Sequence, residues 1–160
     1  MLTKNGKVLL TQSIDSSGRP IDRTFIDTGG GPVSTGHAGY GTGKNMGQVV
    51  EQMCVAVGSG TTNPTADDYC LEQVVNSLTV LSSTNSGNRT ASYEDNYMHS
   101  CSRTYKNNTN SPITISEIGA ITPFKNYSGG NMGTFLFARE VITPVTIQPG
   151  ATYTFSITVG

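Results

Sequence analysis

The feature that most constrains this chain is its last segment, residues 152–159, in which apolar and hydroxyl side chains alternate without a break. One face would carry Tyr153, Phe155, Ile157 and Val159, and the other Thr152, Thr154, Ser156 and Thr158. A period of two residues is the pattern of a β-strand with one buried and one solvated face. The segment therefore predicts a sheet that packs one face against a core.

Short extended segments of this kind recur along the chain and are separated by clusters of Gly, Pro, Asn and Ser. We expect strands at 7–14, 23–27, 49–57, 74–82, 89–93, 97–106, 113–118, 134–142, 145–147 and 152–159. We also expect residues 65–68 to cap a single helical turn that carries Tyr69 and Leu71. The turn clusters lie at 85–88, 107–112, 127–131 and 148–150. Short strands with frequent turns predict an all-β fold, an antiparallel β-sandwich of the jelly-roll or immunoglobulin-like kind.

The composition agrees with strands and turns. Gly, Thr, Ser and Asn together make up 69 of the 160 residues, and charged residues make up 13%. Glycine costs backbone entropy in a helix, and Ser, Thr and Asn side chains compete there for backbone hydrogen bonds. A length of 160 residues suits one core with a short extension.

Residues 1–48 differ from the rest of the chain. Eight of the twenty residues from 28 to 47 are glycine. Such a stretch cannot bury enough apolar surface to offset the entropy lost on ordering. We expect an extended N-terminal arm over 1–48, ordered by a partner surface, and a β-sandwich domain over 49–160.

Two charged residues fall where simple alternation places core residues. Glu117 follows Ile113 and Ile115, and Arg139 follows Phe135 and Phe137. Because an unpaired buried charge is costly, we predict that Glu117 and Arg139 meet as a structural pair that fixes strand register. The alternative is that each strand bulges or ends early and turns its charge to water.

Patterns for catalysis or nucleotide binding are incomplete. A Walker-type loop ending at Gly43-Lys44 would need glycine at Ala38 and Ser or Thr at Asn45. The Gly58-Ser59-Gly60 sequence lacks the flanking glycines of a nucleophile elbow. We predict no enzyme activity, no catalytic residue and no cofactor.

The cysteines do not form a metal-binding pattern. His99 and Cys101 would share a strand face, and Cys54 or Cys70 could add a ligand, but no tight C-x-x-C pair is present. Packing in a core is the commoner role of such cysteines. We predict reduced thiols and no metal site.

The charge and hydropathy of the chain limit its partners. The net charge is −1, so a field that attracts nucleic acid or anionic lipid is missing. Apolar runs of about 18 residues, which a membrane span needs, do not occur. The start of the chain does not read as a secretory signal. We therefore expect no nucleic-acid or membrane partner.

Four segments carry a resemblance to small structural proteins of tailed bacteriophage particles: VGSGTTNPTADDY at 57–69, ITISEIG at 113–119, FLFAREV at 135–141 and VTIQPG at 145–150. The resemblance spans roughly residues 50–159. It implies a non-enzymatic virion protein with a β-sandwich body, with Glu117 and Arg139 as framework residues of that body. It also implies a homo-oligomer, with a trimer as one option.

The resemblance leaves two placements in the virion open. A capsid decoration or head-fibre protein would grip the shell, and hence the major capsid protein, through its arm, whereas a tail or collar component would not. A carbohydrate- or receptor-binding module is the rival from another class, because similar sandwiches present adhesive loops. Tyr93, Tyr97, Tyr105 and Tyr127 could supply stacking faces there, although core or subunit packing is the commoner use of such residues.

Overall fold

The computed structural model describes residues 1–3, 24–34, 53–87, 99–125 and 131–159. These residues are all-β and contain no helix. One antiparallel sheet has the order β3-β6-β7, formed by β3 (Cys54–Gly58), β6 (Ile113–Lys125) and β7 (Asn131–Ile147). A second antiparallel sheet has the order β4-β5-β8, formed by β4 (Thr79–Gly87), β5 (His99–Lys106) and β8 (Thr152–Val159). A small hairpin joins β1 (Thr24–Ile26) to β2 (Pro32–Ser34).

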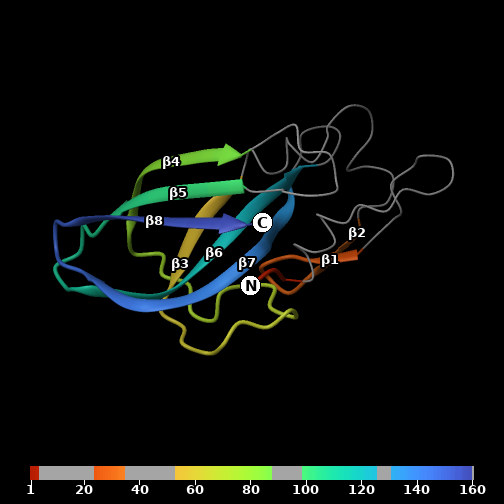
Figure 1. Cartoon of the computed structure of the whole chain (residues 1–160), viewed down its shortest axis with the longest axis horizontal. Helices are drawn as coiled ribbons and strands as arrows, with labels where there is room; N and C mark the ends of the chain where they lie inside the picture. Colours follow the sequence, from red (N-terminus) through yellow and green to blue (C-terminus); the bar gives the residue numbers. More distant parts are fainter. Residues whose placement is uncertain (4–23, 35–52, 88–98, 126–130, 160) are drawn as a thin grey trace, which may run out of the picture.

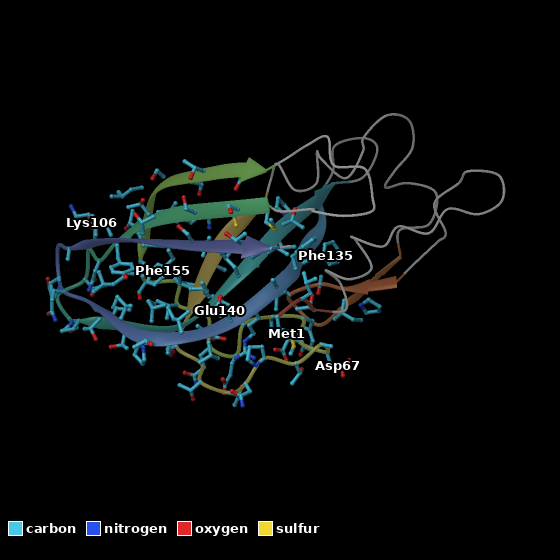
Figure 2. All side chains as sticks on the ribbon, in the orientation of Figure 1. Met1, Asp67, Lys106, Phe135, Glu140 and Phe155 are labelled. Atoms are coloured by element: carbon cyan, nitrogen blue, oxygen red, sulfur yellow. The ribbon has the colours of Figure 1, made fainter. Side chains whose placement is uncertain are left out.

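The two three-stranded sheets share one core, which gives a sandwich-like body (Figure 1). Figure 2 shows side chains of both sheets, with Phe135 on β7 and Phe155 on β8. The first sheet contributes Val55, Val57, Ile115, Ile118, Ala120, Phe135 and Phe137 to this core, and the second contributes Cys101, Tyr105, Phe155, Ile157 and Val159. Burial of apolar side chains from both sheets is the main term that holds them together.

The buried Tyr105 also links the sheets through a polar contact. Its hydroxyl donates a hydrogen bond of 2.7 Å to the carbonyl oxygen of Val55 in the opposite sheet. Its ring meets Phe155 edge-on, with centroids 6.3 Å apart. A buried tyrosine that satisfies its hydroxyl in this way fixes the relative position of the two sheets.

Strand β8 has the bounds that the alternation predicts, so that prediction is confirmed. Phe155, Ile157 and Val159 are buried. Tyr153 differs, because it lies near the start of the strand, is 43% exposed and stacks on Phe155 with ring centroids 4.7 Å apart. The exposed side of β8 consists of hydroxyl residues, as expected.

Two irregularities in the β6–β7 ladder correct the predicted positions of the charges. The register shifts between Ile115 and Glu117, and both Ile115 and Ile118 belong to the core. It shifts again next to Ala120, and the adjacent residues Phe137 and Ala138 both belong to the core. A regular strand cannot place residues three apart, or adjacent ones, on one face. The irregularities therefore turn Glu117 and Arg139 to the face of the sheet that lies away from the core.

Several predicted bounds were wrong. Strand β4 begins at Thr79 rather than at 74 and continues through 85–87, where we expected a turn. Strand β6 extends to Lys125, and β7 joins two predicted strands into one. The helical turn predicted to follow the cap at 65–68 and to carry Tyr69 and Leu71 is absent, and the chain makes only a turn at 66–67 there. The predicted strands at 7–14 and 89–93 lie outside the described residues, as does 49–52.

Parts of the predicted arm lie against β7. The Thr3 amide donates to the carbonyl of Phe137 at 3.1 Å, and the Thr3 hydroxyl donates to the carbonyl of Leu136 at 2.7 Å. Near the β1–β2 hairpin, the Thr28 amide donates to the carbonyl of Thr134 at 2.8 Å. Most of the remaining arm is outside the described residues, so the arm and its boundary at residue 48 stay predictions. Within the described ranges, no helix could cross a membrane.

Candidate functional site

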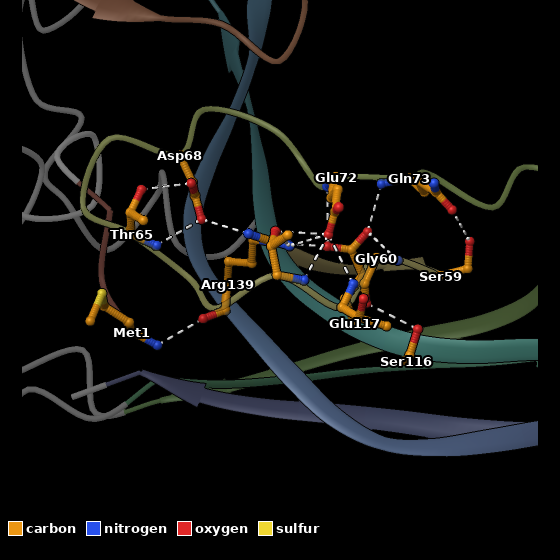
Figure 3. Close-up of polar contacts among 12 residues, drawn as sticks. Met1, Ser59, Gly60, Thr65, Asp68, Glu72, Gln73, Ser116, Glu117 and Arg139 are labelled. Atoms are coloured by element: carbon orange, nitrogen blue, oxygen red, sulfur yellow. Dashed lines mark hydrogen bonds and ion pairs between the residues drawn. The ribbon is translucent and has the colours of Figure 1, made fainter.

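A buried arginine and a buried glutamate lie at the centre of the main polar cluster. The side chain of Arg139, on β7, is 3% exposed, and that of Glu117, on β6, is 0% exposed. The Arg139 Nε donates to Glu117 Oε2 at 2.8 Å (Figure 3). The predicted contact between these two residues is present, although on the face of the sheet away from the core. Its role in fixing register remains a prediction.

The pair is diagonal across the ladder. Glu117 lies opposite Val141, and Arg139 lies opposite Gly119. A Cβ at Gly119 would come within 2.7 Å of Leu136 Cδ1 and 2.9 Å of Leu71 Cδ2. A side chain at this position would thus collide with the packing next to the ion pair.

The segment 59–75, which we call the covering segment, passes over this face of the sheet (Figure 3). Its two ends meet, because the Ser59 amide donates to the carbonyl of Gln73 at 2.9 Å, and its last residue returns to β3, because the Val75 amide donates to the carbonyl of Val57 at 3.0 Å. Ser116 also holds it, since its hydroxyl donates to the carbonyl of Gly60 at 3.0 Å. The covering segment accounts for the burial of charges that would otherwise face solvent.

The Glu117 carboxylate takes backbone donors from the covering segment. Its Oε1 accepts from the amides of Gly60 at 3.0 Å and Gln73 at 2.8 Å. Its Oε2 accepts from the amide of Glu72 at 3.1 Å in addition to Arg139. Two donors at each oxygen approach the full capacity of a carboxylate, which makes its complete burial tolerable.

The other end of the Arg139 guanidinium reaches two more carboxylates. Its Nη1 donates to Asp68 Oδ2 at 2.8 Å. Its Nη2 lies 3.4 Å from Glu72 Oε2 and 3.5 Å from Thr62 Oγ1, at the long end of the hydrogen-bond range. One planar cation thus connects the β6 carboxylate to two carboxylates of the covering segment, a geometry to which the guanidinium fork is suited.

The two carboxylates of the covering segment also order the turns around them. Glu72 Oε2 accepts from the amides of Thr61 and Thr62 at 2.8 and 2.9 Å, and from the Thr62 hydroxyl at 2.8 Å. Asp68 accepts from the amide and hydroxyl of Thr65 at 3.0 and 2.8 Å. Side-chain acceptors here take the place of a regular ladder or helix.

The electrostatics of the cluster favour its charged forms. Burial opposes ionisation of Asp68, but hydrogen bonds from Arg139 and Thr65 outweigh it and hold the pKa of Asp68 below its ordinary 3.8. Hydrogen bonds from the amide and hydroxyl of Thr62 lower the pKa of Glu72 below its ordinary 4.5. Burial opposes the charge on Arg139, and its contacts with Asp68 and Glu117 overcome this and raise its pKa. The cluster is therefore held together by charge at neutral pH.

The three cysteines are free thiols and lie in two different places. Burial raises the pKa of Cys101 to about 12, and both Cys54 and Cys101 lie within electrostatic range of Arg103. Cys70 has Asp68, Glu117 and Arg139 as its charged neighbours instead. The structure thus separates Cys70 from the other two. The His99 side chain is outside the described parts, and those parts contain no cluster of three or more His, Cys, Asp or Glu suited to a metal.

Among the other residues that the sequence singled out, Ser59 and Tyr105 lie in the described part of the chain. The Ser59 hydroxyl donates to Gln73 Oε1 at 3.0 Å, where the chain leaves β3. Tyr105 is core, as described above. Tyr93, Tyr97 and Tyr127 lie outside the described residues, as does the glycine-rich stretch around Lys44.

The sequence reading missed the partners that the covering segment supplies, namely Gly60, Thr62, Asp68, Glu72 and Gln73. A signal was available, because two charges in apolar strands require donors and acceptors from elsewhere in the chain. Which segment provides them depends on the tertiary structure. No family model matches this chain, and searches of curated proteins and of solved structures likewise give no match.

Proposed function

We propose that this chain is a virion structural protein of a tailed bacteriophage, as a capsid decoration or head-fibre component anchored by its N-terminal arm. The observation that carries the proposal, beside the sequence resemblance, is the closed polar cluster around Arg139. The oxygens of Glu117 are all engaged by donors of the chain itself. Such a cluster suits a rigid building block, because its charged groups bind one another and hold the covering segment against the sheet.

The exposed face of the β4-β5-β8 sheet is consistent with this proposal. Eight of its residues, Ser82, Thr84, Ser100, Ser102, Thr104, Thr154, Ser156 and Thr158, are serine or threonine, and Lys106 ends the row on β5; we call the eight residues the hydroxyl face. Hydrogen bonds of 2.6, 2.7 and 2.8 Å join Thr84 to Ser102, Ser100 to Thr158 and Thr104 to Thr154. A surface of hydroxyl groups that bond one another suits repeated contact in an assembly.

The finer fold type belongs to the same proposal. We assign the body to the jelly-roll or immunoglobulin-like sandwiches. In this proposal the remaining part of the arm grips the shell, and the major capsid protein is the partner. The protein acts in many copies, by shape and without catalysis.

Electron microscopy of phage particles with and without this chain tests the proposal. We expect particles lacking the chain to lose density at regularly repeated positions on the head. Loss of density at the tail or collar instead would move the protein to that placement. Particles whose density is unchanged, and from which the chain does not co-purify, would contradict a virion role. Saturable binding on a glycan array by the isolated protein would favour the adhesive alternative.

A further inference from the structure

The strands that the structure describes leave four edges in the two sheets, and three of these edge strands carry features that discourage pairing with another chain. Strand β3 is five residues long, and the covering segment returns beside it through the Gly58–Val74 bridge. Strand β7 is lined by Met1–Thr3 and contains Pro144. The register of β4 shifts between Val80 and Ser82. Short length, coverage, proline and bulges are the usual means of protecting an edge.

Strand β8 carries none of these features. Its sequence, TYTFSITV, contains no charged residue, proline or glycine. It pairs with β5 over all eight residues without a register shift. Among the strands that the structure describes, β5 is its only ladder partner. Within the described part of the chain, one side of β8 is therefore a regular, uncharged edge whose outward backbone groups pair with no other strand.

An uncharged edge is compatible with a second copy of itself. In an antiparallel pair about a two-fold axis, only the residue at the axis lies opposite its own equivalent, and every other residue lies opposite a different position of the second copy. Because no residue of β8 is charged, none of these pairings sets like charges against each other. In an antiparallel pair, directly opposed residues lie on the same face of the sheet. The two longest overlaps of β8 with a second β8 that meet this condition have Phe155 or Ser156 at the two-fold axis. In both alignments hydroxyl residues oppose hydroxyl residues, and the half-exposed Tyr153 lies opposite Ile157 or Val159 of the second copy.

We propose that β8 pairs antiparallel with β8 of a second copy of this chain, forming a continuous six-stranded sheet. The inference does not rest on the virion role. The interface would satisfy the open backbone groups of β8, cover Tyr153 and extend the hydroxyl face across both copies. Pairing by sheet extension draws its affinity from main-chain hydrogen bonds and its register from the alternating side chains.

The test replaces Ser156 by lysine and measures the oligomeric state by sedimentation equilibrium. Ser156 is exposed, so Ser156→Lys should leave the fold intact, while it places two like charges beside the two-fold axis. Ser82→Lys is the matched control, since Ser82 is also an exposed serine of the hydroxyl face but lies on β4. We expect wild type and Ser82→Lys to show about twice the 16.9 kDa chain mass, and Ser156→Lys to dissociate at least about tenfold more readily.

Amide hydrogen exchange identifies the contact itself. In the wild-type dimer, the β8 amides that point away from β5 should exchange slowly, and in Ser156→Lys they should exchange rapidly while the β5–β8 amides stay protected. A wild-type chain that stays monomeric at millimolar concentration would overturn the proposal. So would a trimer, an oligomer that Ser82→Lys disrupts and Ser156→Lys does not, or a dimer whose outward β8 amides exchange freely. None of these outcomes depends on where the protein is found in a particle.

Discussion

Arg139 and Glu117 form a 2.8 Å ion pair between adjacent strands, on the side of the β3-β6-β7 sheet that faces the covering segment rather than the core. The pair joins the sheet to that segment, because Glu117 accepts three of its backbone amides and Arg139 binds Asp68.

Replacing Arg139 by methionine should destabilise the protein strongly. The change leaves the carboxylate of Glu117 buried without its cation, a loss that typically costs about 3–5 kcal/mol. Chemical denaturation measures the free energy of unfolding. The control is Lys106→Met, which also removes a cation from a strand but at a half-buried position on the outer face of the β4-β5-β8 sheet, and we expect it to cost no more than about 1 kcal/mol. Equal free energies of unfolding for Arg139→Met and wild type would show that the ion pair does not stabilise the fold.

Replacing Glu117 by leucine should cost at least as much as Arg139→Met. The leucine cannot accept the amide hydrogens of Gly60, Glu72 and Gln73, and it leaves the guanidinium without one partner. The double variant with Arg139→Met should lose less stability than the sum of the single changes, by about 1–3 kcal/mol. Strict additivity in this double-mutant cycle would show that the two side chains act independently.

Stability should fall in acid as the covering segment loses its charges. The pKa values of Asp68 and Glu72 are lowered in the folded protein, so their contribution is present above the ordinary values of 3.8 and 4.5. It is lost as the pH falls through the lower folded values, because protonation then favours the unfolded chain. Melting temperatures from pH 7 to pH 2 check this. Asp68→Asn should have a lower melting temperature at neutral pH, and its melting temperature should fall less steeply in acid. A fall as steep as that of wild type would show that Asp68 does not contribute to the loss of stability in acid.

Alanine at Gly58 should be poorly tolerated. Its Cβ would overlap the carboxylate of Glu117 and come within 2.6 Å of the carbonyl oxygen of Gln73. Backbone must move to relieve the second contact, so we expect a loss of about 2 kcal/mol. The control is Ser59→Ala, at the next residue, which removes only an exposed hydrogen bond to Gln73 and should cost about 0.5 kcal/mol. A stable Gly58→Ala protein would mean that the covering segment lies farther from β3.

The three thiols should differ in their reaction with iodoacetamide. Burial raises the pKa of Cys101 to about 12, so little thiolate forms at pH 8. Cys54 and Cys70 are partly exposed and should be modified first. Peptide mass spectrometry after timed labelling follows each site, and the denatured protein is the control in which all three should react. Rapid labelling of Cys101 in the native protein would contradict its place in the core.

The sequence by itself determined the kind of fold and one pairing. Alternation over residues 152–159 was sufficient to define β8, because the period of two is a local property of the backbone. The cost of an unpaired buried charge was sufficient to predict the contact between Glu117 and Arg139, although not the face of the sheet on which it lies. Local patterns failed at 85–87, where turn-forming residues continue a strand that pairs with β5 over its whole length.

Only the tertiary structure decided which side of the sheet carries the charges and what covers them. A single shift of register exchanges the two faces of a strand, and no side-chain pattern in the sequence marks the irregularities next to Glu117 and Phe137. The choice of the 59–75 segment as the cover likewise depends on contacts between residues far apart in the chain. Sequence patterns are local, so they named the pair but not the distant residues that surround it.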